Sequence, residues 1–309
     1  MRLSDKKDNL ICTFGIGLHN ISYKTEKLFY MIKQTVAIIG GDKRQLYAAK
    51  KLQNNNCKVY MVGFEKLEHC EGLIITDFDE ALKKADYFLF PVTGVKGLVV
   101  PTAYSKNPIK LDDNLLEQLK SKRIFCGKAD TLQSLGSELR ICDYLRREEF
   151  AVANALPTAE GAVQIAMEQY EGTLFNSDCL VIGYGRIGKI LSRMLRALNA
   201  NVTVSARKSD HLRYIQSDGN TSIKTDEINS LDEFDIVFNT VPKLVIDKKI
   251  LAKTNPETLI IDLASMPGGV DFLTAEKFGI KVIHALSLPG KCAPKAAGEI
   301  ISDTVLDMF

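Results

Sequence analysis

The stretch Cys179-Leu180-Val181-Ile182-Gly183-Tyr184-Gly185-Arg186-Ile187-Gly188 decides the fold class of this chain. Four apolar residues, typical of a buried strand, run directly into a Gly-x-Gly-x-x-Gly turn, and residues 187–198 follow with the pattern of a helix. In this strand–turn–helix context the glycine spacing predicts a dinucleotide site. The first glycine permits the tight turn, the second lets the backbone approach a pyrophosphate, and the third lets helix and strand pack closely. Free N–H groups of the first helical turn then face the phosphates.

The strand after this helix indicates which dinucleotide is bound. NAD-binding turns usually have an acidic residue about 20 positions past the glycines, where it holds the ribose 2′-hydroxyl. This chain has Val204-Ser205-Ala206-Arg207-Lys208 there, without an acid. Ser205 can hydrogen-bond a 2′-phosphate, and Arg207 can pair with it. The sequence therefore favours NADP over NAD, and the alternative is that Arg207 and Lys208 form a solvated loop surface.

Apolar runs and helical patterns alternate along the rest of the chain. Strands are expected over residues 36–39, 59–63, 72–76, 87–91 and 124–127, and again over 179–182, 201–205, 235–239, 259–262 and 281–284. This alternation predicts an α/β protein with two doubly wound parallel-sheet lobes, of which the second is a Rossmann dinucleotide-binding domain. Pro157 marks the expected boundary between the lobes, with Thr158 as the N-cap of a helix over residues 158–170.

Three segments follow from this boundary. Residues 31–156, together with a C-terminal helix at 293–309, are expected to form the substrate-side domain, and residues 157–292 the NADP-binding domain. Residues 1–30 are interpreted as an N-terminal extension that is disordered or arises from a non-native start. Their apolar run at 10–18 is too short to span a bilayer, and no small-residue cleavage site follows it.

The bulk composition excludes several classes of function. A net charge of +2 over 309 residues gives no basis for binding nucleic acid or a membrane surface. The seven cysteines contain no Cys-x-x-Cys pair and have no histidines at ligand spacing, so no metal site is expected. Their odd number and wide spread suit a reducing cytosol.

The first lobe lacks the dinucleotide fingerprint. Its first helix opens with Gly40-Gly41-Asp42, which has only two glycines, and Asp42 would repel a phosphate. We therefore expect one dinucleotide site, with the first lobe facing the substrate.

Ligands of such sheets lie beyond the carboxyl ends of the strands. The loops expected to border the nicotinamide ribose contain Thr240, Val241, Pro242, Asp262, Ala264 and Ser265. The loops expected to bind substrate contain Pro91, Thr93, Gly94, Ser287, Leu288, Pro289, Gly290 and Lys291. His284 is a candidate proton carrier, and a structural hydrogen-bonding role is equally compatible with its place at a strand end. Lys291 can pair with a carboxylate, as can Lys295, or it is an exposed lysine at a helix start.

One expected residue is missing. The 2-hydroxyacid dehydrogenases, which share this layout, have an arginine just after the strand that ends here at Asp262. This chain has Ala264-Ser265-Met266-Pro267-Gly268-Gly269 instead. The sequence therefore disfavours hydride transfer to a 2-keto acid, which would lack its carboxylate clamp.

Several separate motifs, in the same order, resemble those of the A subunit of dipicolinate synthase, and the similarity covers residues 31–309. They are Gly40-Gly41-Asp42 with Arg44-Gln45, Pro157-Thr158-Ala159-Glu160-Gly161, the turn at 183–188, Asp262-Leu263-Ala264-Ser265 with Pro267-Gly268-Gly269, and Leu288-Pro289-Gly290-Lys291 with Ala293-Pro294.

This resemblance implies an NADP-dependent oxidoreductase in the mother-cell cytoplasm of a sporulating bacterium, on a branch of lysine biosynthesis. Its substrate would be 4-hydroxy-tetrahydrodipicolinate or the derived dihydrodipicolinate, its product dipicolinate, and its partner the flavin-related B subunit of dipicolinate synthase. Under this interpretation Lys291 and residues 91–94 bind the substrate carboxylates, His284 is the base, and Glu160 and Ser287 assist. Two other hypotheses stay open: a dinucleotide-binding scaffold whose catalysis depends on the partner, and a 2-hydroxyacid dehydrogenase-like enzyme. A homo-oligomer is also possible.

Overall fold

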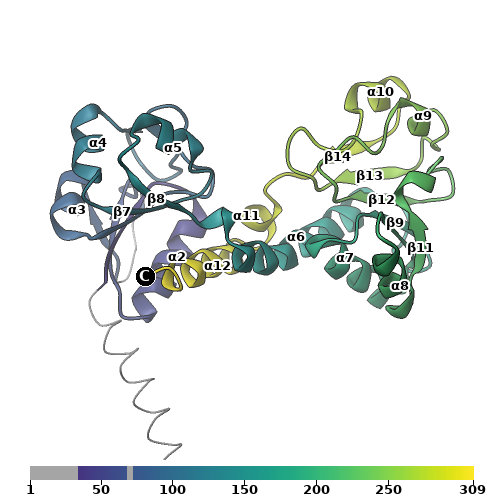
Figure 1. Ribbon diagram of the computed structural model, residues 1–309, viewed down its shortest axis with the longest axis horizontal. Coiled ribbons are helices and arrows are strands. Elements are labelled where there is room, and N and C mark those ends of the chain that lie inside the picture. The colour runs from purple at the N-terminus through teal and green to yellow at the C-terminus, as the bar shows by residue number, and fades with distance from the viewer. Residues whose placement is uncertain (1–33, 68–71) are drawn as a thin grey trace, which may run out of the picture. The chain divides into compact units, whose positions relative to one another are not determined.

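The computed structural model describes residues 34–67 and 72–309. They form two compact units, the first reaching to Tyr144 and including Val305–Phe309, the second spanning Leu145–Thr304 (Figure 1). The proposed extension at residues 1–30, and with it Cys12, lies outside the described residues. Within the described part of the chain, no helix combines the length and apolar character needed to span a bilayer.

The first unit is built on a six-stranded parallel sheet with the order β3-β2-β1-β4-β7-β8. Its strands are β1 (Thr35–Ile39), β2 (Lys58–Val62), β3 (Ile74–Thr76), β4 (Tyr87–Leu89), β7 (Arg123–Cys126) and β8 (Arg140–Asp143). Its helices are α2 (Lys43–Asn54), α3 (Phe78–Lys84), α4 (Asp113–Leu119) and α5 (Asp130–Leu135). A short antiparallel pair, β5 (Val99–Val100) and β6 (Ile109–Lys110), was not foreseen from the sequence.

The second unit repeats the same strand order, β11-β10-β9-β12-β13-β14. Its strands are β9 (Asp178–Ile182), β10 (Asn201–Ala206), β11 (Thr221–Lys224), β12 (Ile236–Asn239), β13 (Leu259–Asp262) and β14 (Val282–His284). Its helices are α6 (Glu148–Gln169), α7 (Arg186–Ala197), α8 (Ser209–Ser217), α9 (Lys248–Leu251), α10 (Phe272–Lys277), α11 (Leu288–Cys292) and most of α12 (Pro294–Leu306). Two single turns, η2 (Tyr144–Arg146) and η3 (Thr225–Glu227), complete the elements. The predicted fold class, two doubly wound parallel sheets of α/β type, is confirmed.

The run of apolar residues in β9 follows from burial on both faces of the second sheet. Cys179 and Val181 pack in one core with residues of α6 and α7, whereas Leu180 and Ile182 pack in another with residues of α9 and α10. Figure 1 shows these two helix pairs on opposite sides of the sheet. A strand covered on both faces has no solvated side, which explains its lack of apolar–polar alternation.

The glycine turn between β9 and α7 depends on close backbone contact. Gly183 has a φ of +101°, in the region that favours glycine. A Cβ atom on Gly188 would lie 2.0 Å from the carbonyl oxygen of Gly183, so only glycine allows α7 to approach the turn. A Cβ on Gly185 would meet no described atom within 4 Å. Gly185 is also the N-cap of α7 and makes no side-chain cap, so the N–H groups of the first turn stay open to a ligand.

The predicted boundary at Pro157 is wrong, because α6 runs through it from Glu148 to Gln169. The Thr158 hydroxyl donates to the Asn154 carbonyl, 2.7 Å away, and does not cap a helix start. A proline inside a helix removes one internal hydrogen bond. Here α6 nevertheless continues, since it packs along α7 and α11. The division falls between Tyr144 and Leu145 instead.

The C-terminal helix also differs from its prediction. Only Val305–Phe309 group with the first unit, whereas the part of α12 up to Thr304 groups with the second. The Arg123 guanidinium donates to the Met308 carbonyl at 2.6 Å, and the Phe309 ring lies 4.5 Å from that of Tyr87. These contacts attach the chain end to β4 and β7 of the first sheet.

We predict that Gly188→Ala and Gly185→Ala separate stability from binding. Because its methyl group collides with the Gly183 backbone, Gly188→Ala should lower the free energy of unfolding by about 1–3 kcal/mol. Gly185→Ala should leave stability within about 0.5 kcal/mol of the parent, but its methyl group occupies the space that a pyrophosphate needs. Urea denaturation and dinucleotide titration of both variants measure the two effects. Equal stability of the two variants would contradict the prediction.

Candidate dinucleotide site

A pocket of about 400 Å³ opens above the carboxyl ends of β9, β10 and β12. Of the residues predicted to bind the cofactor, its lining contains Gly183, Tyr184, Gly185, Ala206, Arg207, Thr240, Val241 and Pro242. This is where the order of the strands reverses, since β10 and β12 lie on either side of β9. Dinucleotides bind at such a switch point. The open helix end, the glycine turn and the pocket together fit a dinucleotide.

The lining also contains residues that the sequence reasoning did not select as ligands. They are Lys208, His211, Thr225, Lys243, Leu244 and Val245. His211 comes from the first turn of α8, and Lys208 is the N-cap of that helix. Arg207, Lys208 and His211 thus gather at the end of β10, and no described lining residue is acidic. A sequence-based prediction that α8 begins at Ser209 would have placed His211 in the first turn of this helix. Helical side chains tilt toward the N-terminus of the helix, which here is the end next to β10.

Tyr184 lines the pocket, and its side chain is fixed by its hydroxyl. That hydroxyl donates to Asp218 at 2.8 Å, and the ring lies edge-on to His211 with centroids 5.7 Å apart. Burial, reinforced by the hydrogen bond to Asp218, raises the pKa of Tyr184 to about 12. The residue therefore contributes a ring surface and a backbone N–H rather than an acid.

Ser205 does not reach the pocket, contrary to prediction. It is completely buried, and its hydroxyl lies 3.2 Å from that of Thr225 and 3.4 Å from the Gly183 nitrogen. Side chains alternate along a strand, and Val204 and Ala206 take the face of β10 toward the α6–α7 core. Ser205 therefore faces the other side, where Thr225 closes over it.

Asp262, Ala264 and Ser265 are likewise absent from the pocket lining. Asp262 is completely buried, and its carboxylate accepts hydrogen bonds from described groups on three residues, Asn239, Ala264 and Gly269. Ala264 is buried as well, and Ser265 is exposed on the loop beyond it. Asp262 is therefore placed to hold loops, not to contact a cofactor.

The remaining fingerprint residues offer backbone groups. Arg186 turns outward, where its guanidinium pairs with Glu148 at 2.7 Å. Ile187 packs against the apolar core, and Gly188 packs against the turn. These three residues make up the first turn of α7. The backbone N–H groups of a first helical turn are the groups that can bind a phosphate.

The four predicted catalytic residues lie on three elements: His284 on β14, Ser287 and Lys291 at α11, and Glu160 on α6. The Nε2 atom of His284 lies 3.1 Å from the Ala264 carbonyl, and its ring stacks on Phe272. Lys291 is exposed on α11, and Ser287, exposed at the start of α11, has a φ of +60°. Glu160 is exposed on α6. No hydrogen bond or ion pair joins any two of these four residues within the described structure.

Close packing of α6 on α11 brings two of the predicted motifs together. A Cβ on Gly161 would lie 2.8 Å from the sulfur of Cys292 and 3.0 Å from Leu288. The Cys292 thiol donates to the Pro157 carbonyl at 3.2 Å. Burial raises the pKa of this thiol, and the charge of Glu160 adds to the effect, so Cys292 is a packing residue. Leu288 and Pro289 are buried and Gly290 is half-buried, which leaves Lys291 as the exposed side chain of this motif.

The predicted substrate loop of the first unit is a tight turn. The Gly94 nitrogen donates to the Pro91 carbonyl at 2.9 Å, and the Gly127 nitrogen to the same oxygen at 3.2 Å. Pro91 and Gly94 are buried, so Thr93 is the polar side chain that this turn exposes.

The glycine turn that opens α2 is closed to a phosphate by its own residues. The Asp42 carboxylate accepts from the Arg44 nitrogen at 3.0 Å, and the Gln45 side chain accepts from the Asp42 nitrogen at 2.9 Å. The Gly41 nitrogen donates to the Pro101 carbonyl at 2.7 Å. Burial of Asp42 opposes ionisation, but its hydrogen bonds and ion pair with Arg44 hold its pKa below the usual value.

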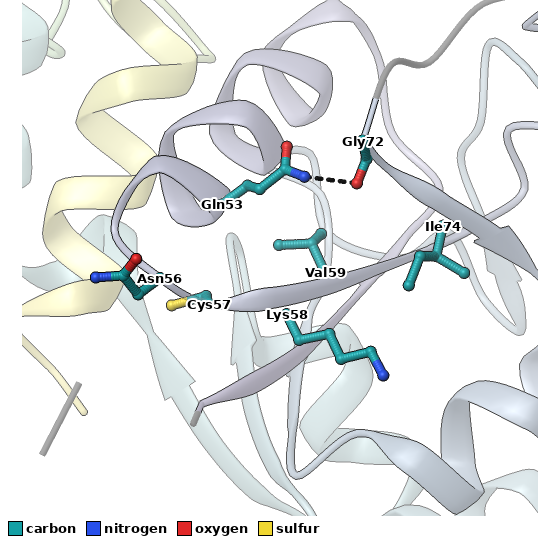
Figure 2. Close-up of a pocket in the computed structure, with 7 residues that line it drawn as sticks. All are labelled: Gln53, Asn56, Cys57, Lys58, Val59, Gly72 and Ile74. Carbon is teal, nitrogen blue, oxygen red and sulfur yellow. Dashed lines mark hydrogen bonds between the residues drawn. The ribbon is translucent and has the colours of Figure 1, made fainter. Parts of the chain in front are cut away.

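Figure 2 shows another pocket, of about 540 Å³, at the amino end of β2 in the first unit. The Gln53 amide reaches across to the Gly72 carbonyl, and burial raises the pKa of the Cys57 thiol to about 11. Among the described lining residues, Lys58 is the charged one. This pocket lies at the edge of the sheet opposite to that where ligands of parallel sheets bind. Cys70 is outside the described residues, among which no group of three potential metal ligands lies together.

Comparison with known proteins agrees with the two-unit structure. Residues 35–141 match the family described as the N-terminal domain of the dipicolinate synthase A subunit. Residues 150–265 match the D-isomer specific 2-hydroxyacid dehydrogenase, NAD binding domain. The dipicolinate synthase A subunit of Bacillus subtilis (strain 168) is 36% identical over 278 residues, which is 87% of this chain and 94% of that protein.

Two solved structures are similar over nearly the whole chain. The structure of the dipicolinate synthase A subunit from Bacillus halodurans has a TM-score of 0.83 and 33% identity, covering 90% of this chain and 98% of its own. The corresponding structure from Bacillus subtilis has a TM-score of 0.80 and 34% identity, covering 89% and 95%. The resemblance inferred from the sequence motifs is thereby confirmed. The chain belongs to the family of dipicolinate synthase A subunits, and its second domain is the nicotinamide-dinucleotide-binding domain of an oxidoreductase.

Proposed function

We propose that this chain oxidises dihydrodipicolinate, derived from 4-hydroxy-tetrahydrodipicolinate, to dipicolinate. Family membership is the observation that supports this substrate. The reaction makes a dihydropyridine aromatic by removing one hydride and one proton from its ring. Oxidised NADP, when bound, accepts the hydride. The chain itself must hold two carboxylates and accept the proton. We further propose that it works with the B subunit of dipicolinate synthase, in the mother-cell cytoplasm of a sporulating bacterium.

The preference for NADP over NAD rests on the charges at the end of β10. Arg207, Lys208 and His211 line the pocket there, and no described carboxylate shares it. A 2′-phosphate carries a negative charge that these groups can pair with, whereas a free 2′-hydroxyl is better held by an acid. Arg207 and Lys208 are exposed, so they are free to meet the phosphate. Because Ser205 is buried against Thr225, we assign the contact with the 2′-phosphate to Arg207, Lys208 and His211 and not to the Ser205 hydroxyl.

The proposed substrate groups are the exposed polar side chains near the strand ends. Lys291 on α11 binds one carboxylate, and Thr93 with the turn at residues 91–94 contributes to binding the other. His284 is the proposed base. Since its Nε2 is engaged with the Ala264 carbonyl, Nδ1 is the atom that would accept a proton. Glu160 and Ser287 are proposed to assist.

A scaffold role is the second candidate. It is favoured by one observation: the four proposed catalytic residues form no hydrogen-bonded set among the described residues. Catalysis would then depend on the partner, the B subunit.

The assay of the chain alone separates these two functions. Incubated with NADP and freshly generated dihydrodipicolinate, the chain should reduce NADP and form dipicolinate, measured by absorbance at the wavelengths of both products. Turnover without the partner excludes the scaffold. Turnover that appears only when the B subunit is added would favour the scaffold role over catalysis by this chain.

Removing the positive charge of Arg207 should weaken NADP selectively. We expect Arg207→Ala to raise the Kd for NADP by about tenfold to a hundredfold, since a charge-assisted hydrogen bond contributes about 1.5–3 kcal/mol. The Kd for NAD should change little, because NAD has no 2′-phosphate. Arg213→Ala, an exposed arginine on α8 outside the pocket, is the matched control. A parent protein that binds NAD tenfold more tightly than NADP would refute the NADP assignment.

Lys291→Ala tests the proposed carboxylate contact. Loss of the ammonium group should raise KM for the dicarboxylate by about tenfold or more, while KM for NADP stays near the parent value. Lys253→Ala, an exposed lysine remote from the proposed contacts, is the control. If Lys291→Ala changes both KM values equally, or neither, Lys291 is not part of the substrate site.

A further inference from the structure

The carboxylate of Asp262, at the end of β13, is enclosed and hydrogen bonded through both oxygens. Its Oδ1 atom accepts from the Asn239 side-chain nitrogen at 2.8 Å and from the Ala264 nitrogen at 3.1 Å. Its Oδ2 atom accepts from the Gly269 nitrogen at 2.8 Å. No ion pair to it occurs in the part of the chain that the structure describes. A buried carboxylate is tolerated only when such donors replace its water shell.

Asn239, at the end of β12, connects Asp262 to the loop that follows β12. Its side-chain nitrogen also donates to the Val241 carbonyl at 3.0 Å, and its Oδ1 atom accepts from the Val241 nitrogen at 3.1 Å. Both backbone polar groups of Val241 are therefore fixed by one buried side chain. Asn239 is itself fixed by Asp262.

The same loop rests on the glycine turn. The nitrogen and the hydroxyl of Thr240 both donate to the Ile182 carbonyl, at 3.0 and 2.9 Å. A Cβ on Gly183 would lie 2.6 Å from the Thr240 hydroxyl and 2.9 Å from a methyl group of Val241. A small displacement of this loop would therefore change the shape of the pocket beside Gly183.

Gly269 fixes the far end of the loop. Its carbonyl accepts from the nitrogens of Val245 and Ile246, at 2.9 and 3.0 Å. A Cβ on Gly269 would lie 2.1 Å from the Asn239 side-chain nitrogen, so the two segments touch directly. The pocket wall at residues 240–245 is thus held at one end by Asn239 and at the other by Gly269, and both are bonded to Asp262.

The order of the strands indicates which half of a dinucleotide this wall borders. The adenosine half lies toward β10, where the second strand holds its ribose, and the pyrophosphate lies at the start of α7. The wall follows β12, on the other side of β9, and so borders the nicotinamide half. We infer that Asp262 is a positioning residue for the nicotinamide half of the cofactor, which it never touches and which it places through Asn239 and the loop at residues 240–245.

This inference rests on the nicotinamide dinucleotide as cofactor but not on the choice between NADP and NAD. Asp262→Asn keeps the size of the side chain but turns one acceptor oxygen into an NH₂ group that faces an N–H donor. Leaving a buried donor unpaired is unfavourable, so the pocket wall should shift or loosen. The adenosine end at Arg207, Lys208 and His211 belongs to other elements and should keep its geometry.

The test compares a whole cofactor with its adenosine half. For Asp262→Asn we expect the Kd of oxidised NADP to rise about tenfold or more, and the Kd of adenosine 2′,5′-bisphosphate to stay within about twofold of the parent, a difference of less than about 0.5 kcal/mol. If the parent prefers NAD, the pair of ligands is NAD and AMP, so failure of the NADP assignment leaves this test intact. Asp232→Asn, an exposed residue before β12, makes the same charge change and should alter neither Kd.

Thermal unfolding shows whether Asp262→Asn is folded, and a second variant is available if it is not. Asn239→Ala removes the bridge to the loop but leaves Asp262 its two backbone donors, so it is used if Asp262→Asn does not fold. It should give the same split between cofactor and fragment. Equal weakening of both ligands would mean that the network only supports the fold. Unchanged binding of both would mean that the loop keeps its place without it. Either result overturns the inference.

Discussion

The second domain depends on one close approach, that of the α7 backbone to the turn after β9. Because Gly188 has no Cβ, the helix begins almost in contact with the Gly183 carbonyl, and its first N–H groups point out of the sheet. The loop after β12 packs on the same glycine from the other side. A pocket edge made of backbone leaves little room for side-chain adjustment, which explains why three glycines occur within six residues.

The fold was predictable because its signals are local. Apolar runs that lack alternation indicate strands covered on both faces, and the glycine spacing identified the turn without tertiary information. Ser205 and Asp262 were misplaced for a different reason. At the end of a strand, adjacent residues face opposite layers, and the sequence does not tell which layer is open to a ligand. Ser205 faces Thr225, and Asp262 faces the loop amides, so both polar side chains satisfy the protein itself.

The predicted domain limits were wrong because tertiary packing overrides the local tendency of proline to end a helix. Pro157 ends a helix in an isolated peptide, but here α6 is supported along its length by α7 and by the tight contact of Gly161 with α11. His211 was missed because its position follows from where α8 begins, and helix boundaries are the least certain part of a sequence-based assignment. The roles of His284, Lys291, Glu160 and Ser287 stay predictions, since they depend on where a substrate lies.

The two sheets share one strand order, and the helices that follow their first strands, α2 and α7, both begin at glycine turns. At α2 the carboxylate of Asp42 occupies the first-turn N–H groups, whereas at α7 the equivalent position is Gly185, which has no side chain. An anion is favourable at the N-terminus of both α2 and α7. In the first sheet the polypeptide supplies that anion itself, as a permanent internal ligand. In the second, Gly185 leaves the same place open, so the side chain at the N-cap is one of the features that distinguish a closed structural turn from one that can take an exchangeable anion.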